Sequence, residues 1–99
     1  MRNRTIKEMQ AMTGASNKAT AERLITAMEG AMCDFQEESD YTIWDWDGAT
    51  YKGHDLVDGE EIHYLEVEAI QGGWRQGFVV MFEINEYDLG FMNDYYEAY

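Results

Sequence analysis

Apolar and polar residues alternate most regularly in residues 60–84. Two stretches, EEIHYLEVEAI and GFVVMFEI, are joined by QGGWRQ, and paired glycines of this kind are typical of a tight connection between strands. A period of two places successive side chains on opposite faces of a strand. The pattern therefore predicts a long β-hairpin, and we expect this hairpin to form the centre of the fold.

The two faces of the predicted hairpin differ in polarity. The face expected to point away from the core carries the carboxylates of Glu66, Glu68 and Glu83 beside Val79 and Met81. An apolar stripe bordered by carboxylates is typical of a protein-binding surface, although packing by the C-terminal segment explains the stripe equally well. The face expected to contact the core is mostly apolar and carries His63, Leu65, Val67, Ala69, Phe78, Val80, Phe82 and Ile84.

Residues 41–52 predict a second, shorter hairpin. Its strands are residues 41–46 and 49–52, and Asp47-Gly48 provides the turn, because Asp-Gly between alternating residues is a strong hairpin signal. Residues 53–59, GHDLVDG, have a glycine at each end and two aspartates between them, and they are interpreted as a loop.

Potential metal ligands gather in this region. The acids match no calcium-loop spacing, and the two histidines, His54 and His63, lack the paired spacing of a zinc site. A solvated acidic loop is the simpler interpretation, so we expect no metal and no other cofactor. The candidate ligands are Asp45, Asp47, His54, Asp55 and Asp58.

Two helices are predicted in residues 1–35. Thr5 with Glu8 three residues later matches a capping box, and Gly14 is suited to end the first helix. Ser16 is suited to cap a second helix, whose apolar stripe continues to Met28. Gly30 either closes this helix or marks a bend, after which the helix extends by a turn. The single cysteine, Cys33, follows this apolar run, and we expect a buried structural thiol there.

Residues 5–28, TIKEMQAMTGASNKATAERLITAM, resemble the helix-turn-helix of winged-helix regulators. The matching features are the turn Thr13-Gly14-Ala15, the cap at Ser16, and Leu24 eight residues later. A plain helical hairpin that covers the sheet is the alternative interpretation, and we prefer it. The resemblance implies that a DNA major groove would contact Ser16, Asn17, Lys18, Thr20 and Arg23.

These elements predict one α+β domain over residues 1–99. A helical hairpin in residues 1–35 packs on an antiparallel sheet of about four strands, the two β-hairpins of residues 41–84. The acidic, aromatic segment 85–99 follows, and it can form a short C-terminal helix.

Charge is distributed unevenly along the chain. The net charge of −13 divides into +2 for residues 1–31, with five bases and three acids, and −15 for residues 32–99, with two bases and seventeen acids. A surface with the negative charge of residues 32–99 repels nucleic acid and anionic membranes and attracts basic partners. Because we find neither an apolar run of about 20 residues nor a signal-peptide pattern, we expect a cytoplasmic protein.

No set of residues suggests catalysis. One cysteine, two histidines and few serines provide no nucleophile with an adjacent base, and the Gly72-Gly73 pair is a hairpin connection, not a phosphate loop. We therefore expect a binding protein with no catalytic residues. A helix-turn-helix regulator or adaptor that binds DNA through residues 16–28 is the alternative.

Carboxylates on one face of a strand repeat at roughly 6.8 Å, and such regular negative charge is similar to that of a nucleic-acid backbone. Small, acidic, single-domain proteins of this kind resemble phage-encoded DNA mimics that block restriction or CRISPR complexes. The resemblance implies inhibition of a basic nucleic-acid-binding host protein by a monomer or homodimer that binds neither nucleic acid nor membrane. The candidate contacts are Asp45, Asp47, Tyr64, Glu66, Glu68, Trp74, Glu83, Asp88, Asp94, Tyr95 and Tyr96.

Overall fold

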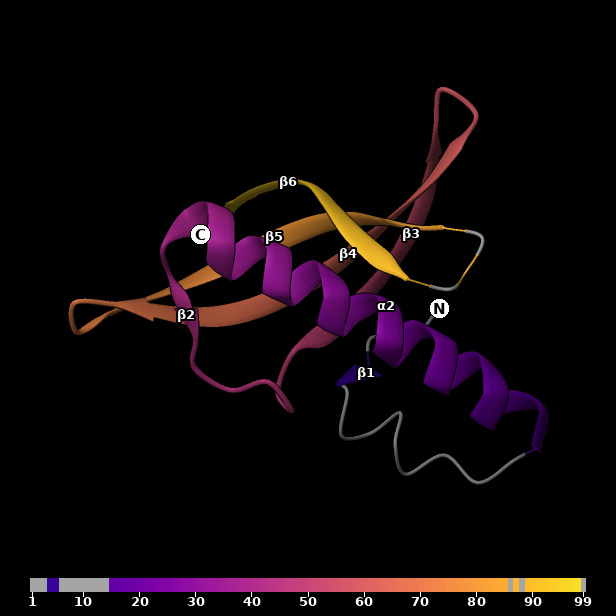
Figure 1. Cartoon of the computed structure of the whole chain (residues 1–99), viewed down its shortest axis with the longest axis horizontal. Helices are drawn as coiled ribbons and strands as arrows, with labels where there is room; N and C mark the ends of the chain where they lie inside the picture. Colours follow the sequence, from indigo (N-terminus) through magenta and orange to yellow (C-terminus); the bar gives the residue numbers. More distant parts are fainter. Residues whose placement is uncertain (1–3, 6–14, 86, 88, 99) are drawn as a thin grey trace.

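The computed structural model of the protein describes residues 4–5, 15–85, 87 and 89–98, and these residues form one antiparallel sheet with a helix across one side of it (Figure 1). The strands follow the order β1-β3-β4-β5-β6, and β2 pairs separately with β4. The elements are β1 (Arg4–Thr5), α2 (Ala15–Ser39), β2 (Thr42–Ile43), β3 (Thr50–Val57), β4 (Glu60–Gln71), β5 (Trp74–Ile84) and β6 (Gly90–Glu97).

The predicted central hairpin is confirmed. Strands β4 and β5 pair in register from His63 with Phe82 to Gln71 with Trp74, and Gly72 and Gly73 form the turn with φ angles of 56° and 87°. Positive φ at both turn residues suits the twist of a two-residue hairpin connection, and glycine adopts it without steric cost. The predicted core face is also confirmed, since its residues in β4 and β5 are buried except for the half-buried Ile84.

The predicted second hairpin is wrong. Strands β2 and β3 do not pair with each other; both pair with the same edge of β4, β2 at its C-terminal end and β3 along its N-terminal half. Asp47-Gly48 belongs to a local turn in which the Asp45 carboxylate accepts a hydrogen bond from the Gly48 amide at 3.1 Å. The hairpin turn is Asp58-Gly59 instead, with φ angles of 52° and 82°, so most of the predicted loop 53–59 is strand.

The predicted helical hairpin is also wrong, because the described residues contain one helix. Arg4 and Thr5, where the first helix is predicted to begin, form β1 and pair with Tyr51 and Thr50 of β3. Helix α2 runs without a break for 25 residues from Ala15 to Ser39. The first helix predicted for the helix-turn-helix of residues 5–28 falls on residues 6–14, which lie outside the described part of the chain.

Two smaller expectations are corrected as well. The C-terminal segment forms strand β6, which pairs with β5, and not a short helix. The free edge of β5 offers unpaired backbone groups, and their pairing outweighs the local preference of the segment. Cys33 is exposed, not buried, because it lies one position along the helix from the buried stripe. Among the described helices and strands, no helix is both long and apolar enough to cross a membrane.

The core lies between α2 and the inner face of the sheet. The helix contributes an apolar stripe, and the sheet contributes residues of β2 to β5. Phe35 of the helix packs against Phe78 and Tyr95, with ring centroids 5.1 and 5.2 Å apart. The helical stripe consists of Ile25, Ala27, Met28, Ala31, Met32 and Phe35.

Helix α2 and strand β6 approach each other closely at Gly30 and Gly90. A Cβ atom on Gly30 would lie 2.5 Å from the Gly90 carbonyl oxygen, and a Cβ atom on Gly90 would overlap the carbonyl of Ala27. The contact between backbones requires glycine at both positions. This explains why a glycine occupies an interior position of helix α2.

Replacing Gly90 with Ala tests this contact. We expect the variant to lose about 1–3 kcal/mol of unfolding free energy, because the added methyl group must push the helix away from the strand. Urea denaturation followed by circular dichroism measures the loss. Asn93→Ala, at an exposed position of the same strand, serves as the control and should change stability by no more than about 0.5 kcal/mol. Equal stability of the two variants would contradict the close contact.

Candidate binding surface and histidine cluster

The side of the sheet opposite α2 is defined by the pairing register. Glu66 pairs with Val79, which pairs with Tyr96, and Tyr64 pairs with Met81, which pairs with Asp94. Paired residues of neighbouring strands project from the same face. We call this surface the outer face, and it consists of Tyr64, Glu66, Glu68, Val79, Met81, Glu83, Phe91, Asp94 and Tyr96.

The outer face has a half-buried centre and an exposed border. Val79 and Met81 are half-buried, whereas Glu68, Asp94 and Tyr96 are exposed. Within the described ranges, the helix packs on the opposite face, and the C-terminal segment extends the sheet as β6. The C-terminal segment therefore lies beside β5 within the sheet and does not pack over Val79 and Met81. Packing by this segment, the alternative explanation of the apolar stripe, is thus not what the structure shows.

Other predicted contact residues lie around this surface. Trp74 is at the tip of the β4–β5 hairpin and is 79% exposed, and Asp45 and Asp47 are exposed between β2 and β3. Tyr95 lies on the inner face against Phe35 and Phe78, so it does not belong to the outer face. Asp88 lies outside the described residues.

Near the β4–β5 turn, a cation already neutralises part of the acidic surface. Arg75 lies 3.3 Å from the Glu68 carboxylate, and its guanidinium is 4.1 Å from the centre of the Trp44 ring. The Trp44 amide donates a hydrogen bond of 2.8 Å to the Glu68 carbonyl, which holds the ring beside the hairpin. Glu68 is therefore less available to a basic partner than Glu66 or Asp94.

At the other end of the sheet, carboxylates crowd together. A hydrogen bond with Glu83 and the charge of that residue raise the pKa of Glu60, and slight burial and Asp58 raise it further. Two neighbouring carboxyl groups repel each other when both are ionised. A cationic group from a partner would relieve that repulsion.

The residues proposed for DNA contact lie on helix α2. Asn17, Lys18 and Thr20 lie in the first turns of α2, where the side chains are not among those described. Arg23 is exposed and lines a pocket on the helix side of the sheet. The same pocket contains both histidines.

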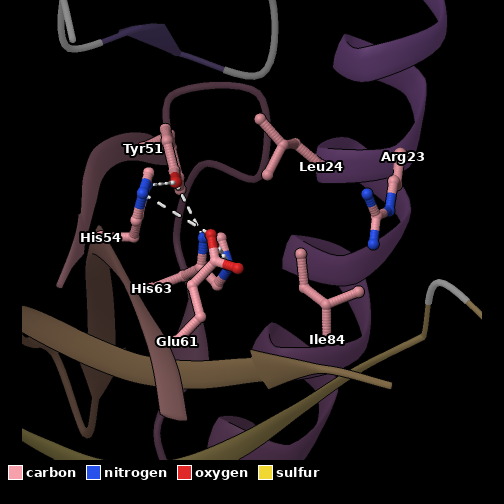
Figure 2. A pocket seen from close by; sticks show the side chains of 7 residues that line it. All are labelled: Arg23, Leu24, Tyr51, His54, Glu61, His63 and Ile84. Carbon is pink, nitrogen blue, oxygen red and sulfur yellow. Dashed lines mark hydrogen bonds and ion pairs between the residues drawn. The ribbon is translucent and has the colours of Figure 1, made fainter. Parts of the chain in front are cut away.

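The two histidines meet across strands β3 and β4. His54 pairs directly with His63, and Glu61 is two residues before His63. The Tyr51 hydroxyl lies 2.8 Å from Nδ1 of His63 and 3.4 Å from Nδ1 of His54. On the other side, Nε2 of each histidine lies 3.6 Å from Oε1 of Glu61. Figure 2 shows these four side chains, which we call the histidine cluster, turned toward one another.

The histidine cluster forms one wall of a pocket of about 210 Å³, and Arg23, Leu24 and Ile84 complete its lining (Figure 2). Burial, with the charge of Glu61, raises the pKa of Tyr51 to about 12, so its phenol stays protonated. Burial also lowers the pKa of His63; Glu61 opposes this effect, and His54 and Arg23 add to it. His63 is therefore a neutral imidazole near pH 7.

Sequence reasoning missed this cluster because it chose the wrong Asp-Gly turn. A two-residue turn at Asp58-Gly59 pairs Val57 with Glu60 and, counting outward, His54 with His63. The signal was present in the sequence Val-Asp-Gly-Glu, between two alternating stretches. The spacing patterns that indicate a zinc site in a sequence require ligands that are close along the chain. They therefore do not detect a pair of ligands on neighbouring strands.

Comparison with protein-family models, with curated proteins and with solved structures finds no match for this chain. The outer face and the histidine cluster are therefore the features from which a function can be inferred.

Replacing Tyr51 with Phe tests the hydrogen bonds of the cluster. We expect a loss of about 1 kcal/mol in unfolding free energy, because the ring remains but Nδ1 of the buried His63 loses its partner. Urea denaturation measures the change. Tyr41→Phe is the control, since the half-buried Tyr41 packs on Phe78 and no described hydrogen bond involves its hydroxyl. A Tyr51→Phe protein as stable as the control would show that the hydroxyl contributes nothing.

Proposed function

We propose that this protein is a non-enzymatic inhibitor that binds a basic, nucleic-acid-binding protein through its outer face and competes with nucleic acid for the same groove. One observation supports this most directly. The paired rows across β4, β5 and β6 place Glu66, Glu83 and Asp94 around an apolar centre, on the sheet face that α2 does not cover.

The acidic charge affects both the rate of association with a basic partner and the competition with nucleic acid. The charge of −15 in residues 32–99 attracts a basic groove from a distance and accelerates encounter. On contact, the rows of carboxylates occupy the positions where Lys and Arg side chains of the partner would otherwise hold phosphates. Nucleic acid and this protein would then exclude each other.

The apolar part of the outer face contributes binding energy that charge alone does not provide. Aromatic residues are enriched where binding energy concentrates in protein interfaces, and Phe91 and Tyr96 are 42% and 51% exposed beside Val79 and Met81. Trp74 at the hairpin tip enlarges the contact area. A protein surface can cover this apolar centre, whereas a nucleic-acid backbone cannot.

The class of partner is a further part of the proposal. Small, acidic phage proteins that inhibit restriction or CRISPR complexes resemble this chain in size and charge. We therefore propose a host-defence nuclease or effector complex as the partner, and the cytoplasm of the host cell as the place of action. The helix-turn-helix regulator is not proposed, because the charge of −15 in residues 32–99 opposes DNA binding.

The outer face can be tested with charge-matched variants. We expect Glu66→Gln, Glu83→Gln and Asp94→Asn together to lower the association rate with a restriction or CRISPR nuclease by about tenfold, and to weaken inhibition of DNA cleavage. Surface plasmon resonance at several salt concentrations measures the rate, which should fall steeply as salt rises.

The control removes three acids from another face. Glu29, Glu37 and Glu38 are exposed on α2, and their replacement by Gln changes the net charge equally. We expect a much smaller effect on the association rate. If both triple variants slow association to the same extent, total charge matters and the outer face does not.

Direct binding to DNA gives an independent test. We expect no retardation of a short DNA duplex in a gel-shift experiment at low salt, because the acidic sheet repels phosphates. A basic DNA-binding protein on the same gel provides the positive control. Tight retardation by this protein would contradict mimicry.

A further inference from the structure

The histidine cluster has a geometry that hydrogen bonding within it does not explain. Each Nε2 atom is 3.6 Å from the same carboxylate oxygen of Glu61, which is beyond the usual 2.7–3.2 Å of a hydrogen bond. The oxygen thus lies between the two rings and bonds closely to neither. Three potential ligand atoms, one each from His54, Glu61 and His63, lie within 4.8 Å of one another.

From this geometry we propose that His54, Glu61 and His63 bind one divalent transition-metal ion, with the properties of Zn²⁺. Zinc binds imidazole nitrogen and carboxylate oxygen at about 2.0–2.2 Å, so tetrahedral ligand atoms are separated by about 3.4 Å. The two separations to Glu61 are already close to that value. Rotations of His54 and Glu61, whose side chains are exposed at the surface, complete the approach.

The backbone holds these ligands in fixed positions. His54 and His63 are direct cross-strand neighbours, and Glu61 precedes His63 on the same face of β4. All three belong to one hairpin, which the Asp58-Gly59 turn keeps in register. Ligands on paired strands are placed more precisely than ligands on a loop.

Tyr51 orients both rings. Its hydroxyl oxygen faces Nδ1 of each histidine, which leaves both Nε2 atoms directed toward Glu61 (Figure 2). When Nε2 of a histidine binds a metal, Nδ1 carries the proton, and one hydroxyl oxygen has two lone pairs to accept both N–H groups. Tyr51 is buried, so this orientation is fixed by the core. Tyr51 is a positioning residue and not a ligand.

The ligand set also limits the type of ion. Imidazole nitrogen is favoured by zinc and its neighbours in the first transition series, whereas Mg²⁺ and Ca²⁺ prefer oxygen throughout. Two histidines and one carboxylate leave a fourth position of a tetrahedral zinc site open. The adjoining pocket of about 210 Å³ has room for the water molecule that we infer at this position.

Calorimetric titration of the full-length, metal-stripped protein with ZnCl₂ tests the site. The titration uses a Cys33→Ser background, because Cys33 is exposed and a thiolate also binds zinc. We expect one Zn²⁺ per chain, and no comparable heat with MgCl₂ or CaCl₂. Substituting CoCl₂ gives a visible absorption spectrum that reports coordination by nitrogen and oxygen.

Four variants separate this site from general attraction of cations to an acidic protein. His54→Ala and Glu61→Gln each remove one exposed ligand and should weaken zinc binding by about tenfold or more, and Tyr51→Phe should weaken it by about tenfold through lost orientation. The outer-face variant with Glu66→Gln, Glu83→Gln and Asp94→Asn loses three acids elsewhere and should bind zinc as the parent does. Circular dichroism establishes that each variant is folded.

Three results would overturn the proposal: no binding at millimolar zinc, unchanged affinity in both His54→Ala and Glu61→Gln, or equal loss in the outer-face variant. A zinc-induced rise in melting temperature that His54→Ala abolishes would support it, because an ion that binds only the folded protein stabilises that protein. These outcomes do not depend on the outer face having any partner.

Discussion

Strand β4 pairs with three other strands, and its register determines both sides of this molecule. Leu65, Val67 and Ala69 face α2, so Glu66 and Glu68 must face outward. Because side chains alternate strictly along a strand, a slip of one residue would bury the carboxylates and expose the core. The cost of burying unpaired charges makes the observed register far more stable than its neighbours.

The same pairing creates two separate chemical environments. On the outer face, rows of carboxylates border Val79 and Met81, and the described helix lies on the other side of the sheet. On the inner side, at the end where β3 and β4 extend toward the turn at Asp58-Gly59, the apolar core gives way to Tyr51, His54 and His63. A partner on the outer face and an ion in the histidine cluster would therefore not compete for space.

Helix α2 completes the core through an unusually close contact. Large side chains fill the space over β4 and β5, whereas at β6 the backbones of Ala27, Gly30 and Gly90 meet directly. A strand at the sheet edge can approach the helix this closely only where side chains are missing. Position 90 thus ties the C-terminal strand to the helix, and this strand contributes Phe91, Asp94 and Tyr96 to the outer face.

The sequence by itself determined the β4–β5 hairpin, because the information is local: an alternation of period two on each side of a glycine pair specifies both the turn and the two faces. It also determined the acidic character of the outer face, since Glu66, Glu68 and Glu83 alternate with the core residues of their own strands, as Val79 and Met81 do. Only the tertiary structure decided which Asp-Gly pair turns the chain and so brought His54 beside His63. Likewise, Arg4 and Thr5 form a strand because β3, far along the chain, offers them pairing partners, and position 30 needs a glycine because the Gly90 backbone packs against it. In each of these cases a contact between distant residues supplied more free energy than the local turn, cap or breaker signal, and such contacts cannot be read from neighbours in the sequence.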